Sequence, residues 1–205
     1  MSKIYEEIKK YSVIPVIAIE NLDDALPLAD ALVEGGLPLI EITFRTKVDA
    51  RVIAKLRDEK PEILLGAGTI LDKDELKAAI DNGASFGVAP GLNPLIVEEA
   101  LKNNFPFMPG IMTPSDLEKG LSLGITHFKF FPAGAAGGIS YLSSLAAPYS
   151  HKGVQFVPTG GVNTENLKDY LSLDTVMAVG GTWIAKSADI NSGNWEKIKA
   201  NCQRI

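Results

Sequence analysis

The sequence contains few of the residues on which disulfides and metal sites depend. Cys202 is the single cysteine among 205 residues, so an internal disulfide and a cysteine-rich metal site are both excluded. The two histidines, His127 and His151, are too far apart in the chain for a zinc motif with both ligands on one helix. We therefore expect no metal at a functional site.

Basic clusters and long apolar runs are also missing. The chain has 20 basic and 25 acidic residues and a net charge of −5, so we expect neither nucleic acid nor an anionic membrane as a partner. Residues 1–12 are charged and lack the apolar core of a signal peptide. No apolar run reaches the length of about 18 residues that spans a bilayer. These features predict a cytoplasmic protein.

Apolar residues and turn residues, by contrast, are plentiful. Apolar residues make up 46% of the chain and charged residues 22%, a composition typical of a folded domain rather than a disordered chain. The 19 glycines and 12 prolines indicate many short connections. Because no linker or break in composition divides the chain, we predict one domain over residues 1–205.

Short apolar runs alternate with longer segments of helical periodicity. The runs are apolar along their whole length, as is typical of strands covered on both faces. Strands are expected at residues 14–19, 39–44, 63–67, 86–89, 107–109, 127–131, 154–157 and 176–179. Helices are expected at residues 3–11, 22–34, 72–82, 114–123, 164–172 and 194–202, and the charges of residues 50–62 indicate the solvent face of another helix.

Eight strand–helix units in about 200 residues are the smallest size of a (β/α)8 barrel. We therefore predict an α/β fold, a single-domain (β/α)8 TIM barrel with a short extra helix at the N-terminus. The alternative is a doubly wound open sheet. The first expected strand is not followed by a Gly-x-Gly-x-x-Gly turn, which counts against that alternative.

Two charged residues fall inside expected strands. Phe128 and Phe130 share one face of the sixth strand, and large aromatic side chains belong against the helices. Because side chains alternate along a strand, Lys129 then points into the barrel. The same alternation points Glu41 of the second strand inward. His127, two residues before Lys129, is expected to be a packed imidazole rather than a base.

A buried lysine suits addition to a carbonyl group. Desolvation disfavours the charged form of an amine, and Schiff-base enzymes use the neutral amine as a nucleophile. Arg45, just beyond the second strand, adds a cation that repels a charged lysine or holds a substrate carboxylate with two hydrogen bonds. The alternative is that Glu41 and Lys129 form a buried ion pair without chemistry.

Glycine-rich turns follow the seventh and eighth strands, at Thr159-Gly160-Gly161 and Gly180-Gly181-Thr182. Glycines let backbone N–H groups approach an anion, and the loops after strands 7 and 8 are the usual phosphate site of such barrels. The alternative is that they are ordinary turn glycines. Two such turns on adjacent strands favour the phosphate site.

Two further strand ends carry candidates for substrate binding. Thr69 ends the third strand and offers its hydroxyl to a carboxylate or carbonyl, or to a helix cap. Pro90 lies in the rigid turn Ala89-Pro90-Gly91 after the fourth strand, where the alternative role is chain reversal alone.

Several segments together resemble one known family. They are PVIAI, EITFRT (residues 41–46), GAGTI (66–70), APG (89–91), PGIMTPSDL (109–117), FKFFPA (128–133), PTGGV (158–162) and GGTW (180–183). In this order they resemble the 2-keto-3-deoxy-6-phosphogluconate aldolase family, which also includes enzymes acting on 4-hydroxy-2-oxoglutarate. The resemblance spans residues 13–185, and the combination of FKFFPA with EITFRT is specific to it.

The resemblance implies a class I aldolase of (β/α)8 fold, usually a homotrimer, that serves the Entner–Doudoroff pathway. Lys129 matches the Schiff-base lysine of the family and Glu41 its general acid and base. The residues at matching substrate-binding positions are Arg45, Thr69, Pro90, Phe131, Thr159, Gly160, Gly161, Gly180, Gly181 and Thr182.

The expected reaction cleaves a phosphorylated keto acid, 2-dehydro-3-deoxy-6-phosphogluconate, to pyruvate and glyceraldehyde 3-phosphate without a cofactor. One alternative is an aldolase for 4-hydroxy-2-oxoglutarate, which yields pyruvate and glyoxylate. Another is a barrel that only binds a phosphate ligand. Glu20, after the first strand, departs from the neutral or basic residues of the family.

Overall fold

Strands and helices alternate along the chain, as the sequence predicts. The computed structural model describes residues 2–205. The strands are β1 (Val13–Ile17), β2 (Leu39–Thr43), β3 (Leu64–Gly68), β4 (Phe86–Val88), β5 (Phe107–Met108), β6 (Gly110–Ile111), β7 (His127–Phe130), β8 (Gln155–Pro158) and β9 (Val179–Gly181). The α-helices are α1 (Ser2–Tyr11), α2 (Ala25–Glu34), α3 (Asp49–Glu59), α4 (Lys73–Asp81), α5 (Pro94–Lys102), α6 (Pro114–Ser122), α7 (Gly138–Ala146), α8 (Leu167–Leu171), α9 (Ser187–Asn191) and α10 (Trp195–Cys202). Two 3-10 helices are η1 (Leu22–Asp24) and η2 (Ala147–Lys152).

Every strand pairing among the described residues is parallel. One sheet has the strand order β5-β4-β3-β2-β1-β9, and a second has the order β6-β7-β8. In the first sheet Glu41 pairs with Val16 on one side and Gly66 on the other, and in the second Lys129 pairs with Gly110. The fold is therefore an α/β fold built on parallel strands.

Pro109 accounts for a difference from the sequence prediction. A proline has no N–H to donate to a neighbouring strand. The strand expected at residues 107–109 therefore ends at Met108 as β5, which pairs with β4, and a separate strand, β6, follows Pro109 and pairs with β7. The last strand begins at Val179, and Val176 makes only a single bridge to Phe156. The predicted eight-stranded barrel is therefore not present as one continuous sheet.

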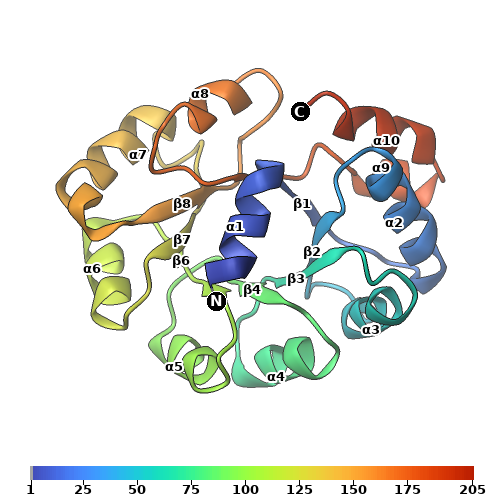
Figure 1. The fold of residues 1–205 in the computed structure, drawn as a ribbon, viewed down its shortest axis with the longest axis horizontal. Helices are drawn as coiled ribbons and strands as arrows, with labels where there is room; N and C mark the ends of the chain where they lie inside the picture. The colour runs from blue at the N-terminus through green and yellow to red at the C-terminus, as the bar shows by residue number, and fades with distance from the viewer. Residues whose placement is uncertain (1) are drawn as a thin grey trace.

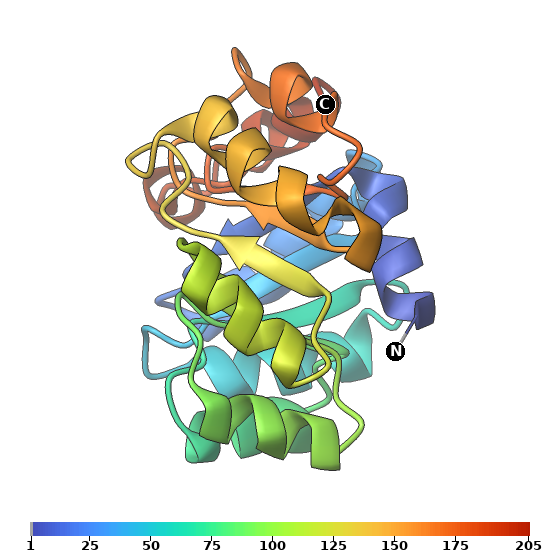
Figure 2. The same cartoon turned by 90° about the vertical axis from the view of Figure 1, so that its left-hand side faces the viewer.

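Helices surround the strands. Figure 1 shows α2 to α10 on the outside, while α1 crosses the centre of the view. Figure 2, turned by 90°, shows α1 at one end of the strands, with β7 pointing away from it. The carboxyl ends of the strands therefore lie opposite to α1. No helix among residues 2–205 is long and apolar enough to cross a membrane.

Burial follows the alternation of side chains along the strands. Phe128 and Phe130 belong to the large cluster shared with the surrounding helices, together with Ile40 and Ile42 of β2, so the outward direction predicted for the two phenylalanines is confirmed. A second cluster contains strand side chains and one residue of α1. Its buried members are Ile8, Ile14, Leu39, Phe86, Val88, Met108, Val157, Met177 and Ala178.

Helix α1 is anchored by an aromatic pair at the amino end of β7. The rings of Tyr5 and His127 stack with their centroids 3.8 Å apart and an interplanar angle of 8°. The Tyr5 hydroxyl donates to the carbonyl oxygen of Phe107 over 3.4 Å. Burial raises the pKa of Tyr5 to about 12 and lowers the pKa of His127. His127 is therefore a packed imidazole, as the sequence predicts.

Candidate active site

The two charged residues predicted to point inward lie next to each other. Lys129 Nζ is 3.5 Å from Glu41 Oε1, and the two side chains are 7% and 2% exposed. Glu41 comes from β2 and Lys129 from β7, in different sheets. Glu41 Oε1 accepts no hydrogen bond from the described residues, so it retains lone pairs for a proton of a water or substrate. A buried amine and a buried carboxylate thus share one site.

Gly68, at the end of β3, makes room for this carboxylate. A Cβ atom at position 68 would overlap the carboxylate of Glu41, so any larger residue there displaces Glu41. The register of the sheet explains the approach, because Thr43 pairs with Gly68 and Glu41 with Gly66. The end of β3 therefore forms one wall of the site.

Phe131 joins the lysine to the first glycine-rich turn. Lys129 Nζ lies 5.5 Å from the centre of the Phe131 ring, a distance at which a ring attracts a cation. On its other side the ring lies close to Gly160, where a Cβ atom would be 3.2 Å from it. Phe131 thus limits the space around the amine and connects it to residues 159–161.

The first predicted glycine-rich turn lies beside Gly180 and Gly181, which the structure places inside β9, paired with Ile14 and Pro15 of β1, rather than in a turn after the strand. Thr159 and Gly180 form a parallel bridge. Gly160 and Gly161 have φ values of +86° and +89°, which favour glycine. The backbone conformation of the first turn therefore itself requires glycine at these two positions. Gly134 N donates to Gly160 O over 2.8 Å and holds this turn against the loop after β7.

The two threonines of these turns differ in their surroundings. Thr159 is buried, and its hydroxyl donates to the carbonyl oxygen of Val157 over 3.3 Å. Thr182 is exposed. A phosphate would therefore receive hydrogen bonds from the backbone N–H groups of the turns and from the Thr182 hydroxyl more readily than from the hydroxyl of Thr159.

Arg45 forms a hydrogen bond with the side chain of Thr43, a residue that the sequence prediction did not include in the site. Arg45 Nε donates to Thr43 Oγ1 over 3.1 Å, and Thr43 Oγ1 donates to the carbonyl oxygen of Ile17 over 3.1 Å. The signal was present in the sequence, because alternation places Thr43 on the same face of β2 as Glu41. The bonds themselves depend on the pairing of β2 with β1.

Thr69 and Pro90 lie at neighbouring strand ends. Thr69 follows β3 and has φ = +59°, which is an outlier for a β-branched residue. Pro90 lines an apolar cavity of about 270 Å³ together with Leu71, Leu92 and other residues, and neither Glu41 nor Lys129 lines this cavity. The structure therefore brings Thr69 to the wall beside Glu41, through Gly68, and places the carbonyl group of Pro90 close to Gly110, which pairs with Lys129.

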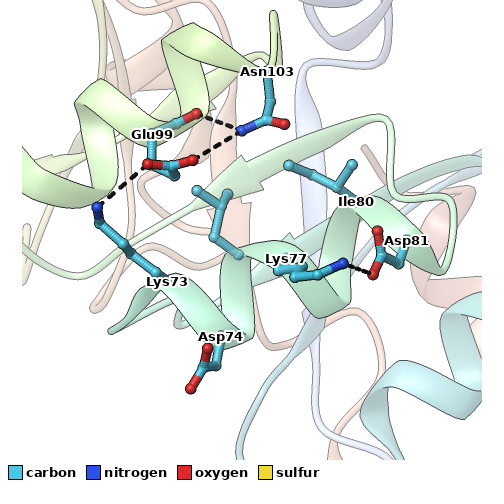
Figure 3. A pocket seen from close by; sticks show the side chains of 8 residues that line it. Lys73, Asp74, Lys77, Ile80, Asp81, Glu99 and Asn103 are labelled. Atoms are coloured by element: carbon cyan, nitrogen blue, oxygen red, sulfur yellow. Dashed lines mark hydrogen bonds and ion pairs between the residues drawn. The ribbon is translucent and has the colours of Figure 1, made fainter.

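A larger groove on the outer surface lacks the buried lysine and carboxylate of the site described above. It has a volume of about 390 Å³ and lies between α4 and α5 (Figure 3). Its charged side chains pair with one another, as Lys73 does with Glu99 at 3.3 Å and Lys77 with Asp81. Asn103 also donates to the backbone oxygen of Glu99. These are solvated pairs on two helices, and we do not regard the groove as an active site.

Fold and site together define a class: parallel α/β proteins with a buried amine beside a carboxylate, and with glycine-rich turns at neighbouring strand ends. The family model for KDPG and KHG aldolases matches residues 4–201, so the chain belongs to the KDPG and KHG aldolase family. KDPG is 2-keto-3-deoxy-6-phosphogluconate, and KHG is 4-hydroxy-2-oxoglutarate. The family resemblance found in the sequence is confirmed.

Individual relatives cover nearly the whole chain. The 2-dehydro-3-deoxy-phosphogluconate aldolase of Haemophilus influenzae is 42% identical over 196 residues, which are 96% of this chain and 92% of the relative. A KDPG aldolase from Legionella pneumophila, solved with pyruvate captured at low pH as a covalent carbinolamine intermediate, has a TM-score of 0.90 and 41% identity over 94% of this chain and 92% of that chain. The aldolase of Zymomonas mobilis, solved with 3-phosphoglycerate, has a TM-score of 0.89 and 34% identity over 98% of this chain and 93% of that chain.

Proposed function

We propose that the protein is a class I aldolase that cleaves 2-dehydro-3-deoxy-6-phosphogluconate to pyruvate and glyceraldehyde 3-phosphate. The observation that carries this proposal is the buried Lys129 amine, 3.5 Å from the carboxylate of Glu41 at the site. The Haemophilus influenzae relative bears the name of this activity. The Legionella pneumophila structure, which contains a covalent pyruvate carbinolamine, supports a lysine intermediate.

The first half of the reaction forms an imine. Lys129 passes its ammonium proton to Glu41, and the resulting amine adds to the C2 carbonyl of the keto acid. Glu41 then returns this proton to the C2 oxygen and carries a second proton from the nitrogen to the same oxygen, which leaves as water. The product is an iminium between Lys129 and C2. The unpartnered Oε1 of Glu41 supports this shuttle, because it has lone pairs to accept the proton.

The second half breaks the carbon–carbon bond. Glu41, directly or through a water, takes the proton of the C4 hydroxyl as the C3–C4 electron pair moves into the iminium. Glyceraldehyde 3-phosphate leaves, and the enamine on Lys129 is protonated at C3. Water then hydrolyses the iminium and releases pyruvate. Atoms and electrons balance without a cofactor.

The remaining predicted site residues bind the ends of the substrate in this proposal. Arg45 and Thr69 hold the carboxylate beside C2, and Phe131 keeps water from the imine. The backbone of Gly160, Gly161, Gly180 and Gly181 and the exposed Thr182 hydroxyl bind the 6-phosphate. The buried Thr159 supports the first turn through its hydrogen bond to Val157 O. Pro90 shapes the neighbouring strand end, where its carbonyl group lies close to Gly110.

The paired glycine turns favour a phosphorylated substrate over 4-hydroxy-2-oxoglutarate. The turn that starts at Thr159 lies beside the end of β9 at Gly180, so that backbone N–H groups from both strand ends can face one anion. Comparing kcat/KM for the two keto acids tests this preference. A higher value for 4-hydroxy-2-oxoglutarate would assign the site to the non-phosphorylated substrate.

Trapping of the imine tests the proposed function. We expect that incubation with pyruvate and borohydride adds the mass of the reduced pyruvate adduct to the peptide that contains Lys129. Lys129→Ala should lose both the adduct and cleavage, whereas Lys186→Ala, a change at an exposed lysine, should retain both. Absence of an adduct from the wild-type protein would leave only the alternative of a barrel that binds phosphate.

For the fold we propose one domain over residues 1–205 whose strands close into a (β/α)8 barrel. Two parallel bridges, Phe156 with Val176 and Thr159 with Gly180, support closure between β8 and β9. On the other side Lys129 N donates to Pro109 O over 3.0 Å, which continues the contact across the interrupted fifth strand. Slow amide exchange at these bridging positions is the expected result.

We further propose that the partners are small molecules and other copies of the chain. A phosphorylated keto acid is too polar to cross a bilayer readily, which supports a cytoplasmic location, testable by cell fractionation. A homotrimer is implied by the family. The exposed apolar side chains Leu71, Leu95 and Met112 support it, because all three lie beyond the carboxyl ends of strands, after β3, β4 and β6. Light scattering of the intact protein tests the mass.

A further inference from the structure

The hydroxyl of Thr43 joins Arg45 to strand β1. Thr43 is 1% exposed, and its Oγ1 lies 3.1 Å from Ile17 O and 3.1 Å from Arg45 Nε. A carbonyl oxygen only accepts hydrogen bonds and an arginine Nε only donates them. The hydroxyl must therefore donate to Ile17 and accept from Arg45. Its one proton and one lone pair are both engaged in a defined direction.

These hydrogen bonds determine which edge of the Arg45 guanidinium is free to bind a carboxylate. An arginine binds a carboxylate with two parallel hydrogen bonds, through its two Nη groups or through Nε and one Nη. The Nε of Arg45 already donates to Thr43. Within residues 2–205, no side-chain hydrogen bond is found for its Nη groups. Arg45 therefore presents its Nη end to a ligand.

The backbone around Arg45 is held as well. Arg45 N donates to Thr43 O over 2.8 Å, and Thr46 N donates to the carboxylate of Asp49 over 2.7 Å at the start of α3. Asp49 is 3% exposed, and burial raises its pKa although hydrogen bonds from Thr46 oppose that rise. With the main chain anchored on both sides, the remaining freedom of Arg45 lies in its side chain.

We infer that Thr43 is a positioning residue that orients the Arg45 guanidinium toward the carboxylate of the keto acid. The inference rests on the proposed function and deepens it. Thr43 does not touch the substrate; it removes side-chain freedom that Arg45 would otherwise lose on binding. The pairing of Thr43 with Gly68 explains why the carboxylate site forms here, since Thr69 follows Gly68 directly.

The test replaces the hydroxyl without changing the shape of the side chain. In Thr43→Val we expect KM for the keto acid to rise about tenfold, or about 1.4 kcal/mol, with kcat changed less than about threefold. Thr43→Ser should return KM to within about twofold of wild type, because it restores the acceptor. Thr126→Val is the matched control, since Thr126 bonds to His127 at the other end of β7.

A ligand without a carboxylate distinguishes a loss of Arg45 positioning from a general loss of protein stability. Borohydride trapping of pyruvate should weaken about tenfold in Thr43→Val, while trapping of pyruvamide, which has no carboxylate, should change less than about twofold. In an Arg45→Ala background Thr43→Val should have no further effect on trapping of pyruvate. Circular dichroism verifies folding, and Thr43→Ala replaces the valine variant if valine does not fold.

Two outcomes would overturn the inference alone, with the wild-type protein still trapping pyruvate. One is an equal loss from Thr43→Val with and without Arg45. The other is an equal loss for pyruvate and pyruvamide. If the wild-type protein traps no pyruvate at all, both the proposed function and this inference are wrong.

Discussion

At the scale of single residues, Glu41 depends on one neighbour. Its carboxylate is 2% exposed, and its charged partner in the structure is Lys129 at 3.5 Å. Removing one member of a buried pair leaves the other charge uncompensated, at a cost of about 3–5 kcal/mol. Pairing and the proposed chemistry are therefore compatible explanations of these residues, because the contact that compensates the charge of Glu41 is also the one through which the proposed reaction moves a proton.

Replacing Glu41 separates imine formation from cleavage. We expect Glu41→Gln still to form the pyruvate imine, but more slowly, because Lys129 remains and water must take its proton in place of Glu41; cleavage of the keto acid should be at least about 100-fold slower because the general base is missing. Glu20→Gln, a change at an exposed carboxylate, serves as control. Steady-state rates and borohydride trapping measure both effects, and an unaltered cleavage rate would remove Glu41 from its proposed role.

Thr69 combines backbone strain with a proposed binding role. Its φ of +59° costs about 1–3 kcal/mol for a residue of this kind. We expect Thr69→Gly to raise the free energy of unfolding by about 1 kcal/mol and to weaken pyruvate trapping. Thr69→Ala should weaken trapping without the same gain in stability. Denaturant unfolding checks this, and a less stable glycine variant would contradict it.

At the scale of elements, α1 closes the end of the strands opposite to the active site. Ile8 of α1 is fully buried among strand side chains, and Tyr5 stacks on His127. His127 and Lys129 lie two residues apart on β7, so one strand carries both the anchor of α1 and the proposed nucleophile. Strand β7 therefore connects helix α1, at one end of the strands, to the proposed active site at the other end.

This anchor should make stability depend on pH. A histidine in the unfolded chain takes up a proton near pH 6.5, whereas burial lowers the pKa of His127 in the folded state and the charge of Glu6 only partly opposes this. Protonation then favours unfolding, so stability is lost as the pH falls below about 6.5.

The comparison uses His127→Phe, which keeps a ring to stack on Tyr5. We expect this variant to lose less stability than wild type between about pH 7.5 and about pH 5.5, measured by denaturant unfolding. His151→Asn, in the exposed part of η2, should behave as wild type does. Parallel pH profiles for wild type and His127→Phe would rule out the histidine as the cause.

At the scale of the whole molecule, exposed apolar surface predicts association. Leu95 is 61% exposed and Leu71 55%, and burying such side chains between copies is favourable. We expect Leu95→Lys to shift the mass measured by light scattering from trimer toward monomer. Ile205→Lys, at another exposed apolar side chain, should leave the mass unchanged. A trimer in Leu95→Lys would place the interface elsewhere.

Much of the element order was predictable, and the exceptions have physical reasons. Helix α6 begins as predicted at Pro114, after the cap residue Thr113, whose side chain accepts from Asp116 N while the Asp116 carboxylate accepts from Thr113 N. Helix α7 was not predicted, because it follows a glycine-rich segment and Gly137 gives it no side-chain cap. Tertiary packing therefore determines α7, whereas local hydrogen bonds mark α6.

The sequence by itself determined the alternation of strands and helices, the inward side of Glu41 and Lys129, and the glycines at the ends of the last two strands, because these follow from the period of the backbone and from local side chains. Only the tertiary structure decided the 3.5 Å contact between Glu41 and Lys129 and the bonds that join Arg45 to Ile17 through Thr43. Such contacts depend on which strands pair and in which register, and residues far apart in the chain set that register together.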